Sequence, residues 1–65
     1  MKVTYDTETD TLRVLLKPGP IAESDEEKVG VIIDFDEAGD VVGFEIMDAS
    51  TRVEDPRRME FATLG

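Results

Sequence analysis

Four stretches of the chain alternate between apolar and polar side chains, which is the pattern of β-strands with one buried face. They cover residues 2–6, 11–17, 29–36 and 40–48. Short polar or glycine-containing turns at residues 6–10 and 37–39 join them into two hairpins. The sequence therefore predicts a mainly β domain at residues 1–50, built as a four-stranded antiparallel meander.

One face of the predicted sheet is strongly apolar and needs a covering layer. Within the chain, the only candidate cover is the tail, residues 51–65, which is short for a whole sheet. We expect partial cover by the tail together with a homodimer, or cover by another protein. The predicted apolar face consists of Val3, Tyr5, Leu12, Val14, Leu16, Val31, Ile33, Phe35, Val42, Phe44 and Ile46.

Two segments lack the alternation. Residues 18–28 begin with prolines that cannot donate to a β-ladder, and continue into an acidic run. They predict a connection, with a short edge strand near 21–24 or a helical turn at 24–27 as alternatives. In the tail, Asp55 and Pro56 are suited to the start of a helix. The sequence therefore predicts a short helix at 56–64, with an irregular tail as the alternative. With that helix, the class would be α+β.

Composition narrows the possible functions. The 65 residues allow one domain, and they contain no cysteine or histidine for disulfides or a zinc site. The net charge of −9 opposes binding to nucleic-acid phosphates or anionic lipid, and favours a basic protein or a cation. No signal peptide or membrane-spanning run is evident, so a cytoplasmic location is expected.

Three carboxylates beside the second hairpin turn are candidate metal ligands. Asp34, Asp36 and Asp40 flank Gly39 and resemble the start of a calcium loop. Ala38 occupies a position where a further oxygen ligand would be needed, and no bidentate glutamate closes the loop. The pattern therefore indicates either weak Ca²⁺ or Mg²⁺ binding or a hairpin turn with solubilising flanks. No other cofactor is predicted.

Acidic side chains outside that turn form a candidate partner surface. Arg52, Arg57 and Arg58 are possible partners for the acidic cluster, within the chain or across a dimer. Glu45 is expected to face solvent or to pair with Arg13 on a neighbouring strand. The candidate surface consists of Glu23, Asp25, Glu26, Glu27 and Glu45.

The sequence offers little for catalysis. Paired carboxylates can act as acid and base, but they need a pocket that shifts a pKa. The chain has no cysteine or histidine, and no lysine beside a glycine-rich loop that would suit nucleophilic or phosphate-binding chemistry. We therefore predict a protein that is not an enzyme.

The order of motifs over residues 1–50 resembles the small bacterial family called domain of unknown function 2283. The resemblance implies a small β-rich fold and no established activity. Members of such families are sometimes encoded beside small toxin-like proteins. This suggests an antitoxin-like role, in which the protein would bind a small basic protein. Arg13 departs from the pattern, which usually has an aromatic residue there. The resemblance is carried by Tyr5-Asp6, Glu8, Asp10, Leu12, Glu23-Ser24, Gly30-Val31, Asp34-Phe-Asp36, Gly39, Val42-Gly-Phe-Glu-Ile46 and Ala49-Ser50.

These observations lead to two functional hypotheses. The first is a non-catalytic protein-interaction module, antitoxin-like in its most concrete form, that acts as a homodimer or binds a small basic protein. The alternative is a weak divalent-cation-binding domain that uses the hairpin at residues 34–40.

Overall fold

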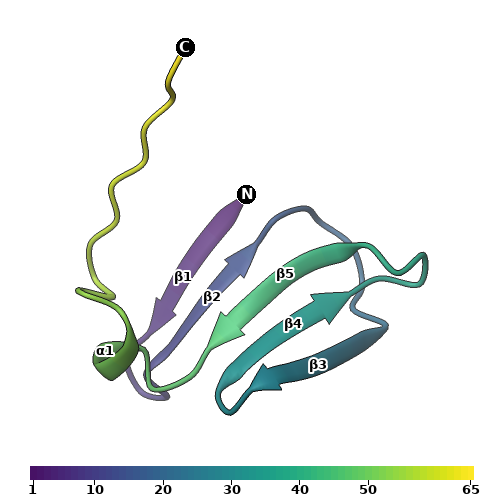
Figure 1. The fold of residues 1–65 in the computed structure, drawn as a ribbon, viewed down its shortest axis with the longest axis horizontal. Coiled ribbons are helices and arrows are strands. Elements are labelled where there is room, and N and C mark those ends of the chain that lie inside the picture. The colour runs from purple at the N-terminus through teal and green to yellow at the C-terminus, as the bar shows by residue number, and fades with distance from the viewer.

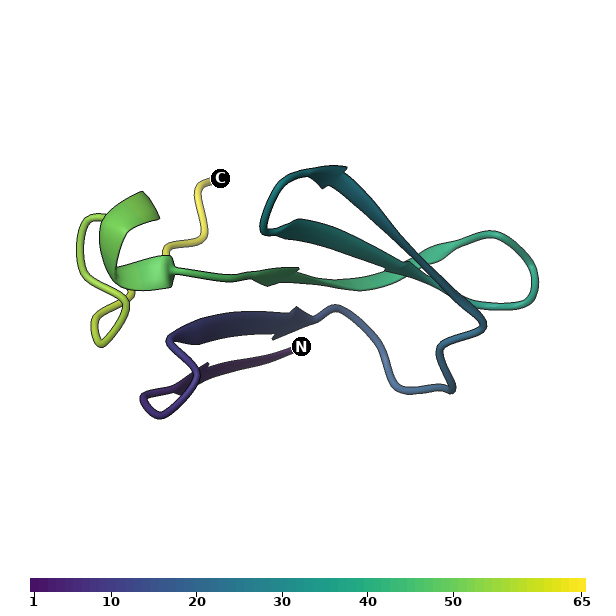
Figure 2. The ribbon, with the colours of Figure 1, turned by 90° about the horizontal axis from the view of Figure 1, so that it is seen from below.

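The computed structural model describes residues 1–65 and confirms the mainly β class. Five antiparallel strands form one sheet in the order β1-β2-β5-β4-β3, and one short helix follows β5 (Figure 1). Seen from the side, the sheet is a single twisted layer (Figure 2). The elements are β1 (Lys2–Asp6), β2 (Thr11–Leu15), β3 (Glu23–Lys28), β4 (Val31–Phe35), β5 (Val41–Ile46) and α1 (Ala49–Arg52).

The predicted four-stranded meander is wrong in strand count and in connection. The hairpins β1–β2 and β4–β5 are both present, but β5 pairs with β2, and β4 lies outside it. Apolar strands gain most from two neighbours, so β5 occupies the centre, where Val42 and Gly43 are buried. The polar segment before β4 then occupies the edge.

The edge strand β3 is formed by residues that were expected to be a connection, with a short edge strand near 21–24 as one alternative; the observed strand starts later and is longer. All six of its residues are exposed, and none is apolar, so no alternation marks the strand. Its pairing is set by β4, with Glu23 opposite Phe35 and Asp25 opposite Ile33. The turn into β4 contains Gly30 at a positive φ of 82°, and the Gly30 N–H donates to the Glu26 carboxylate at 2.9 Å.

The strand register confirms that the predicted apolar residues share one face. Opposite residues in an antiparallel pair point to the same side, so each pair below lies on this face. The pairs do not include Phe35 and Val42, which lie where the register shifts and Phe35 pairs with Val41, or Leu16, which lies one residue beyond β2 and is 38% exposed. The cross-strand pairs are Val3–Val14, Tyr5–Leu12, Leu12–Ile46, Val14–Phe44, Ile33–Phe44 and Val31–Ile46.

The tail forms no helix at residues 56–64, so the predicted helix is wrong and the irregular tail, its alternative, is what the structure has. Asp55 instead starts an isolated turn, with its carboxylate accepting from the Arg57 N–H at 3.0 Å. A helix here would place two arginines at its positive N-terminus and is too short to persist without packing. The helix that does form, α1, spans residue 50, so the expected boundary between residues 1–50 and 51–65 falls inside it.

Hydrogen bonds to the Asp10 side chain hold α1 against the first hairpin. The Asp10 carboxylate accepts from the Tyr5 hydroxyl at 2.7 Å, and from the Ser50 N–H and hydroxyl at 3.0 and 2.6 Å. These donors, Ser50 first and then Tyr5, hold the pKa of Asp10 below its usual value. Asp10 also adopts a positive φ of 53°, which aspartate and asparagine tolerate better than most residues. These hydrogen bonds therefore fix the position of α1, and with it the position at which the tail begins.

Replacing Asp10 with alanine should release α1 from the sheet. Asp10→Ala removes three hydrogen bonds and puts a residue with a Cβ but no side-chain acceptor at a positive φ. We expect the Ser50 amide to exchange with solvent roughly tenfold faster or more, because its acceptor is lost. Asp10→Asn is the matched control, since it keeps an acceptor oxygen and tolerates the backbone conformation. Unchanged exchange in Asp10→Ala, measured by NMR, would contradict the role given to Asp10.

Candidate functional site

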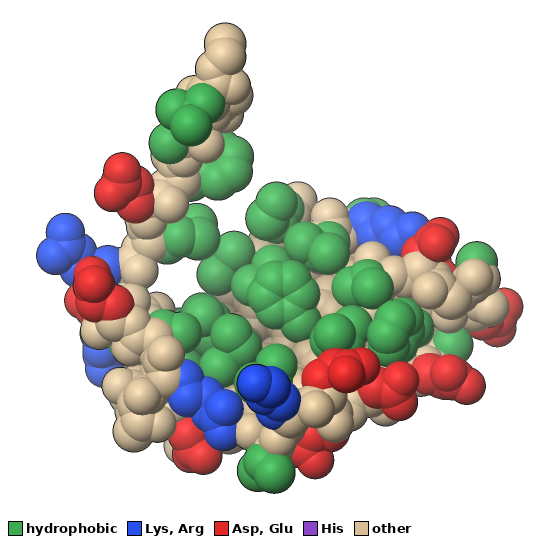
Figure 3. All heavy atoms as spheres, viewed as in Figure 1, with side chains coloured by type: hydrophobic (Ala, Val, Ile, Leu, Met, Phe, Trp, Pro, Cys, Tyr) green, Lys and Arg blue, Asp and Glu red, His purple; other side chains and the backbone are tan.

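The apolar face of the sheet is the largest feature that the chain leaves unoccupied. Hydrophobic side chains form a broad area over the central strands (Figure 3). Val42 and Ala49 are the only hydrophobic side chains that are fully buried, at 1% and 0% exposure. The rest of the face is only partly shielded, as expected when a sheet has one layer and no covering element. No helix in the structure is long and apolar enough to cross a membrane.

The charge around this face is uneven. Acidic side chains gather along the β3 side, and basic and acidic side chains lie together beside α1 and the tail (Figure 3). Glu23 and Asp25 belong to this side of the sheet, because they pair with Phe35 and Ile33. Arg57 lies over the Tyr5 ring, with the guanidinium carbon 6.0 Å from the ring centre. The face therefore has an acidic rim at β3 and a rim of mixed charge at β1.

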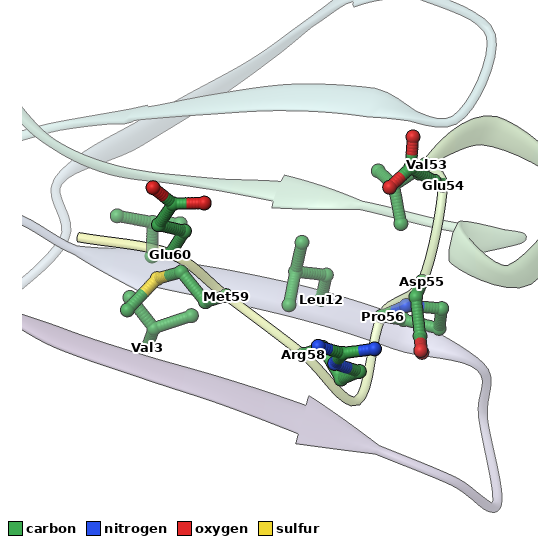
Figure 4. Close-up of a pocket in the computed structure, with 10 residues that line it drawn as sticks. Val3, Leu12, Val53, Glu54, Asp55, Pro56, Arg58, Met59 and Glu60 are labelled. Atoms are coloured by element: carbon green, nitrogen blue, oxygen red, sulfur yellow. The ribbon is translucent and has the colours of Figure 1, made fainter.

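The tail shapes a groove over β1 and β2. Residues 53–60 run across these strands, and the Met59 side chain lies near those of Val3 and Leu12 (Figure 4). The groove has a volume of about 630 Å³, and half of its ten lining residues are hydrophobic. Beyond it, Phe61 and Leu64 are 74% and 93% exposed. The tail therefore covers one corner of the apolar face and leaves its own end without contacts.

The predicted cation site at the hairpin turn does not assemble as a cluster. Asp36 accepts backbone N–H bonds from Ala38 and Asp40 at 3.0 and 2.9 Å, which shapes the turn. Lys17 lies 3.4 Å from Asp36 and 3.5 Å from Asp40. The Asp40 N–H first, and then Lys17, lower the pKa of Asp36. No group of three or more carboxylates is arranged to hold a metal ion, and Asp34 is engaged elsewhere.

Asp34 forms a buried carboxyl pair with Glu45 on the opposite face of the sheet. Its side chain is only 1% exposed, and Oδ1 accepts from the Ser24 hydroxyl at 2.6 Å. Oδ2 is buried and accepts from no other donor. Gly43 lies opposite Asp34, and Glu45 is two residues further along β5, within hydrogen-bonding reach of the Asp34 carboxylate. A proton on Glu45 would supply the donor that Oδ2 lacks.

The environment of Glu45 favours its protonated form. Burial raises its pKa first, and the hydrogen bond and negative charge of Asp34 raise it further. Arg13, directly opposite Glu45 in the register, acts in the other direction. Arg13 is a cross-strand neighbour of Glu45, but the two form no ion pair, and the only close ion pairs in the structure belong to Lys17.

The predicted partner surface is split between the two faces. Glu23 and Asp25 lie opposite Phe35 and Ile33 on the apolar face, whereas Glu26 lies opposite Ile32 on the face that carries Glu45. Glu27 also lies on β3. The arginines expected to meet the β3 acids inside the chain do not do so. Arg52 donates to the Val29 carbonyl at 2.5 Å, and the tail arginines lie at the other side of the sheet. A contact across a dimer stays a prediction.

Comparison with known proteins confirms the family that the motifs over residues 1–50 indicate. The sequence matches the family model described as "Protein of unknown function (DUF2283)" over residues 2–50. The chain belongs to this family. A curated relative, an uncharacterized protein of Methanocaldococcus jannaschii, is 46% identical over 50 residues. The match covers 77% of this chain and 42% of that relative, so the chain spans less than half of the relative's length. No solved structure matches it.

The family match places the features of this DUF2283 protein in two groups. All five strands, the Asp34–Glu45 pair and the contact between Asp10 and Ser50 fall inside residues 2–50. The tail, with Arg57, Arg58 and the exposed apolar residues, falls outside. The family match therefore covers the whole sheet, and the tail lies outside it.

Proposed function

We propose that this protein is a non-catalytic protein-interaction module that binds through the apolar face of its sheet. The observation that carries the proposal is the lack of cover over that face. A sheet normally buries its apolar side against a second layer, and a domain of this size has little stability to lose. With Val42 and Ala49 as its only buried hydrophobic side chains, the chain leaves that second layer to be supplied from outside.

The position of the carboxyl pair supports a non-catalytic role. The groove beneath the tail is lined by Val3, Leu12 and Val14 from the apolar face. Asp34 and Glu45 lie on the other face, so the one close carboxyl pair does not reach the groove. A catalytic acid and base must approach a bound substrate, and this arrangement separates them from the cavity.

The acidic rim of the face favours a particular kind of partner. The carboxylates on β3 suit a basic surface, and charge complementarity steers association and fixes register. A small basic protein, as in an antitoxin-like role, is such a partner. The cation-binding alternative has less support, because Lys17 already pairs with Asp36 and Asp40, and no three carboxylates are arranged to hold a metal ion.

Thiol labelling tests whether the apolar face is covered in cells. The chain has no cysteine, so single-cysteine variants report on single positions. Ile33→Cys lies on the apolar face, and Thr4→Cys is an exposed control on the opposite face. With N-ethylmaleimide added to intact cells and modification read by mass spectrometry, we expect Ile33→Cys to react at least roughly tenfold more slowly than Thr4→Cys. Similar rates for both thiols in cells would refute the proposed function.

A further inference from the structure

The free edge of β1 is regular and unprotected. β1 is one of the two outer strands, and its register with β2 runs from Lys2 to Asp6 without a shift. Edge strands usually carry charges, prolines or bulges that discourage the addition of another strand. The other outer strand, β3, has a register shift between Glu26 and Lys28, and five of its six residues are charged. By contrast, β1 has only one charged residue at each end.

The backbone groups on the free side of β1 belong to Val3 and Tyr5. In an antiparallel sheet, successive residues turn their N–H and C=O groups toward opposite neighbours. The Leu16 N–H donates to a carbonyl of β5 at 2.8 Å, so every second residue of β2, counted back from Leu16, faces β5. Arg13 therefore faces β1, and its partner Thr4 faces β2. Val3 and Tyr5 face outward, and no turn or loop forms a hydrogen bond with their backbone.

The sequence of β1 is complementary to itself when two copies lie antiparallel. With a two-fold axis through Thr4, Lys2 of each copy lies opposite Asp6 of the other, and Val3 lies opposite Tyr5. Opposite charges then meet at both ends of the strand pair. The outward N–H and C=O groups of Val3 and Tyr5 meet in hydrogen-bonded pairs. Apolar side chains lie opposite apolar side chains, so the apolar faces of the two sheets are continuous.

Other two-fold registers match less well. An axis through Val3 places Lys2 opposite Thr4, and an axis through Tyr5 places Asp6 opposite Thr4, so both charge pairs are lost. An axis midway between two residues would pair an apolar side chain with a polar one, which a sheet with one apolar face does not tolerate. The pattern therefore selects a second copy as the occupant of this edge, because the same strand supplies both halves of the match.

The end of the tail extends to where a second copy would lie. It runs past β1, on the side of the sheet where β1 has no neighbour (Figure 1). Phe61 and Leu64 in this segment are 74% and 93% exposed. A two-fold axis normal to the sheet keeps both apolar faces on one side, which is the side that the tail crosses. The two residues would then lie over the partner's groove and add the apolar area that a short strand pair lacks.

We propose that two copies of this chain join through their β1 edges into one continuous sheet, with Lys2 of each copy opposite Asp6 of the other and the end of each tail over the partner's groove. The backbone hydrogen bonds and the charge pairs set the register, and the apolar residues of the tail add affinity. This interface goes beyond the proposed function, because the apolar face over β4 and β5 stays free for another protein.

Charge reversal at one end of β1 tests the dimer in the full-length purified chain. Sedimentation equilibrium should show a dimer for the wild-type protein. Lys2→Asp should raise the dimer dissociation constant about tenfold or more at low salt, because it places an aspartate opposite Asp6 at both ends of the interface. Lys28→Asp is the matched control, since it makes the same charge change on β3 and should alter the constant by less than about twofold. Both lysines are exposed, and circular dichroism checks that the variants fold.

Paired cysteines test the register. In the proposed dimer, the Cα atoms of Lys2 and the opposite Asp6 are about 4.5 Å apart, within the reach of a disulfide. The two Lys2 positions are about 14 Å apart, which is beyond that reach. The chain has no other cysteine. Oxidation of a mixture of Lys2→Cys and Asp6→Cys should therefore give a disulfide-linked heterodimer, detected by mass spectrometry, whereas each variant alone should stay unlinked.

Polar substitutions test the position of the tail. Phe61→Ser with Leu64→Ser should raise the dimer dissociation constant about tenfold, because apolar area is lost from the interface. Both side chains are exposed in the single chain, so folding should be unaffected. An unchanged constant would overturn the placement of the tail over the partner's groove.

Three results would overturn the β1 interface. They are a wild-type protein that stays monomeric to millimolar concentration, a dimer that Lys2→Asp weakens no more than Lys28→Asp does, and a cysteine mixture that forms no heterodimer. All three are separate from the labelling of Ile33→Cys in cells, because Ile33 lies on β4 and two strands separate β4 from β1. In the purified β1 dimer, Ile33→Cys should remain reactive.

Discussion

Gly43→Ala should unfold a large part of the protein under conditions in which the wild type is native. Gly43 is buried in the central strand β5, and an added Cβ would lie 2.5 Å from the Val14 carbonyl oxygen and 3.5 Å from Leu15 Cα. Both obstacles are backbone atoms of β2, so no side-chain rotation can relieve the overlap. The central β2–β5 pairing must shift instead.

The expected cost is large relative to the stability of a domain this small. Overpacking in a close-packed interior costs about 1–3 kcal/mol, and a displaced central strand pair puts this substitution at the upper end. A 65-residue chain is expected to have about 3–10 kcal/mol in total. We expect urea unfolding to show a loss of about 3 kcal/mol.

Gly39→Ala is the matched control for this prediction. Gly39 has a positive φ of 85°, but an added Cβ there meets nothing within 4 Å. Only backbone strain is introduced, with an expected cost of about 1 kcal/mol. Equal losses for the two variants would show that the close approach of β2 to β5 does not explain the glycine at position 43.

Glu45→Gln should make the protein more stable at neutral pH. It should also make the free energy of unfolding vary less with pH. In the folded state, burial and Asp34 raise the pKa of Glu45 above its ordinary value of 4.5. The folded protein therefore holds this proton more tightly than the unfolded chain. The resulting stabilisation is fully present below pH 4.5 and is lost as the pH rises through the higher folded pKa.

A glutamine keeps the donor that Glu45 loses at high pH. Its amide can donate to Asp34 Oδ2, which is buried and otherwise without a donor. We expect a gain of about 1 kcal/mol at pH 7 in urea unfolding, the usual net value of such a hydrogen bond, and no gain at about pH 4. Asp34→Asn removes the same like-charge contact from the other side, and should also flatten the profile.

Glu37→Gln is the control, because it removes one negative charge from an exposed turn of the same acidic protein. The carboxylates with lowered pKa, Asp10 and Asp36, act with the opposite sign, since their stabilisation is lost only as the pH falls below about 3.8. A Glu45→Gln profile parallel to that of the wild type would show that the pair does not share a proton.

The apolar part of the fold was predictable because its signal is local. The period-two alternation gave β1 with its observed bounds, both hairpins, and the eight residues that the register pairs on the apolar face. The edge strand β3 was not predictable in the same way. Its six polar residues have no alternation, and they form a strand because β4 offers a free edge across a tight turn.

The carboxyl pair depends on contacts between strands. Asp34 and Glu45 both point away from the apolar face, which the alternation of each strand indicates. Their closeness depends on register, and the register shifts near Asp34 and Phe35, where β5 carries an extra residue. A search for carboxylates on the polar face of one hairpin would have suggested the pair. Its burial against Ser24 required β3, which the sequence does not mark as a strand.

The outer strand also determines how far an assembly of this protein can extend. The free side of β3 presents backbone N–H and C=O groups to which any extended chain could add. Five of the six β3 residues are charged, four of them negatively. A second β3 that approached edge to edge would bring mostly negative side chains together. Growth by strand addition is therefore disfavoured on this side at neutral pH.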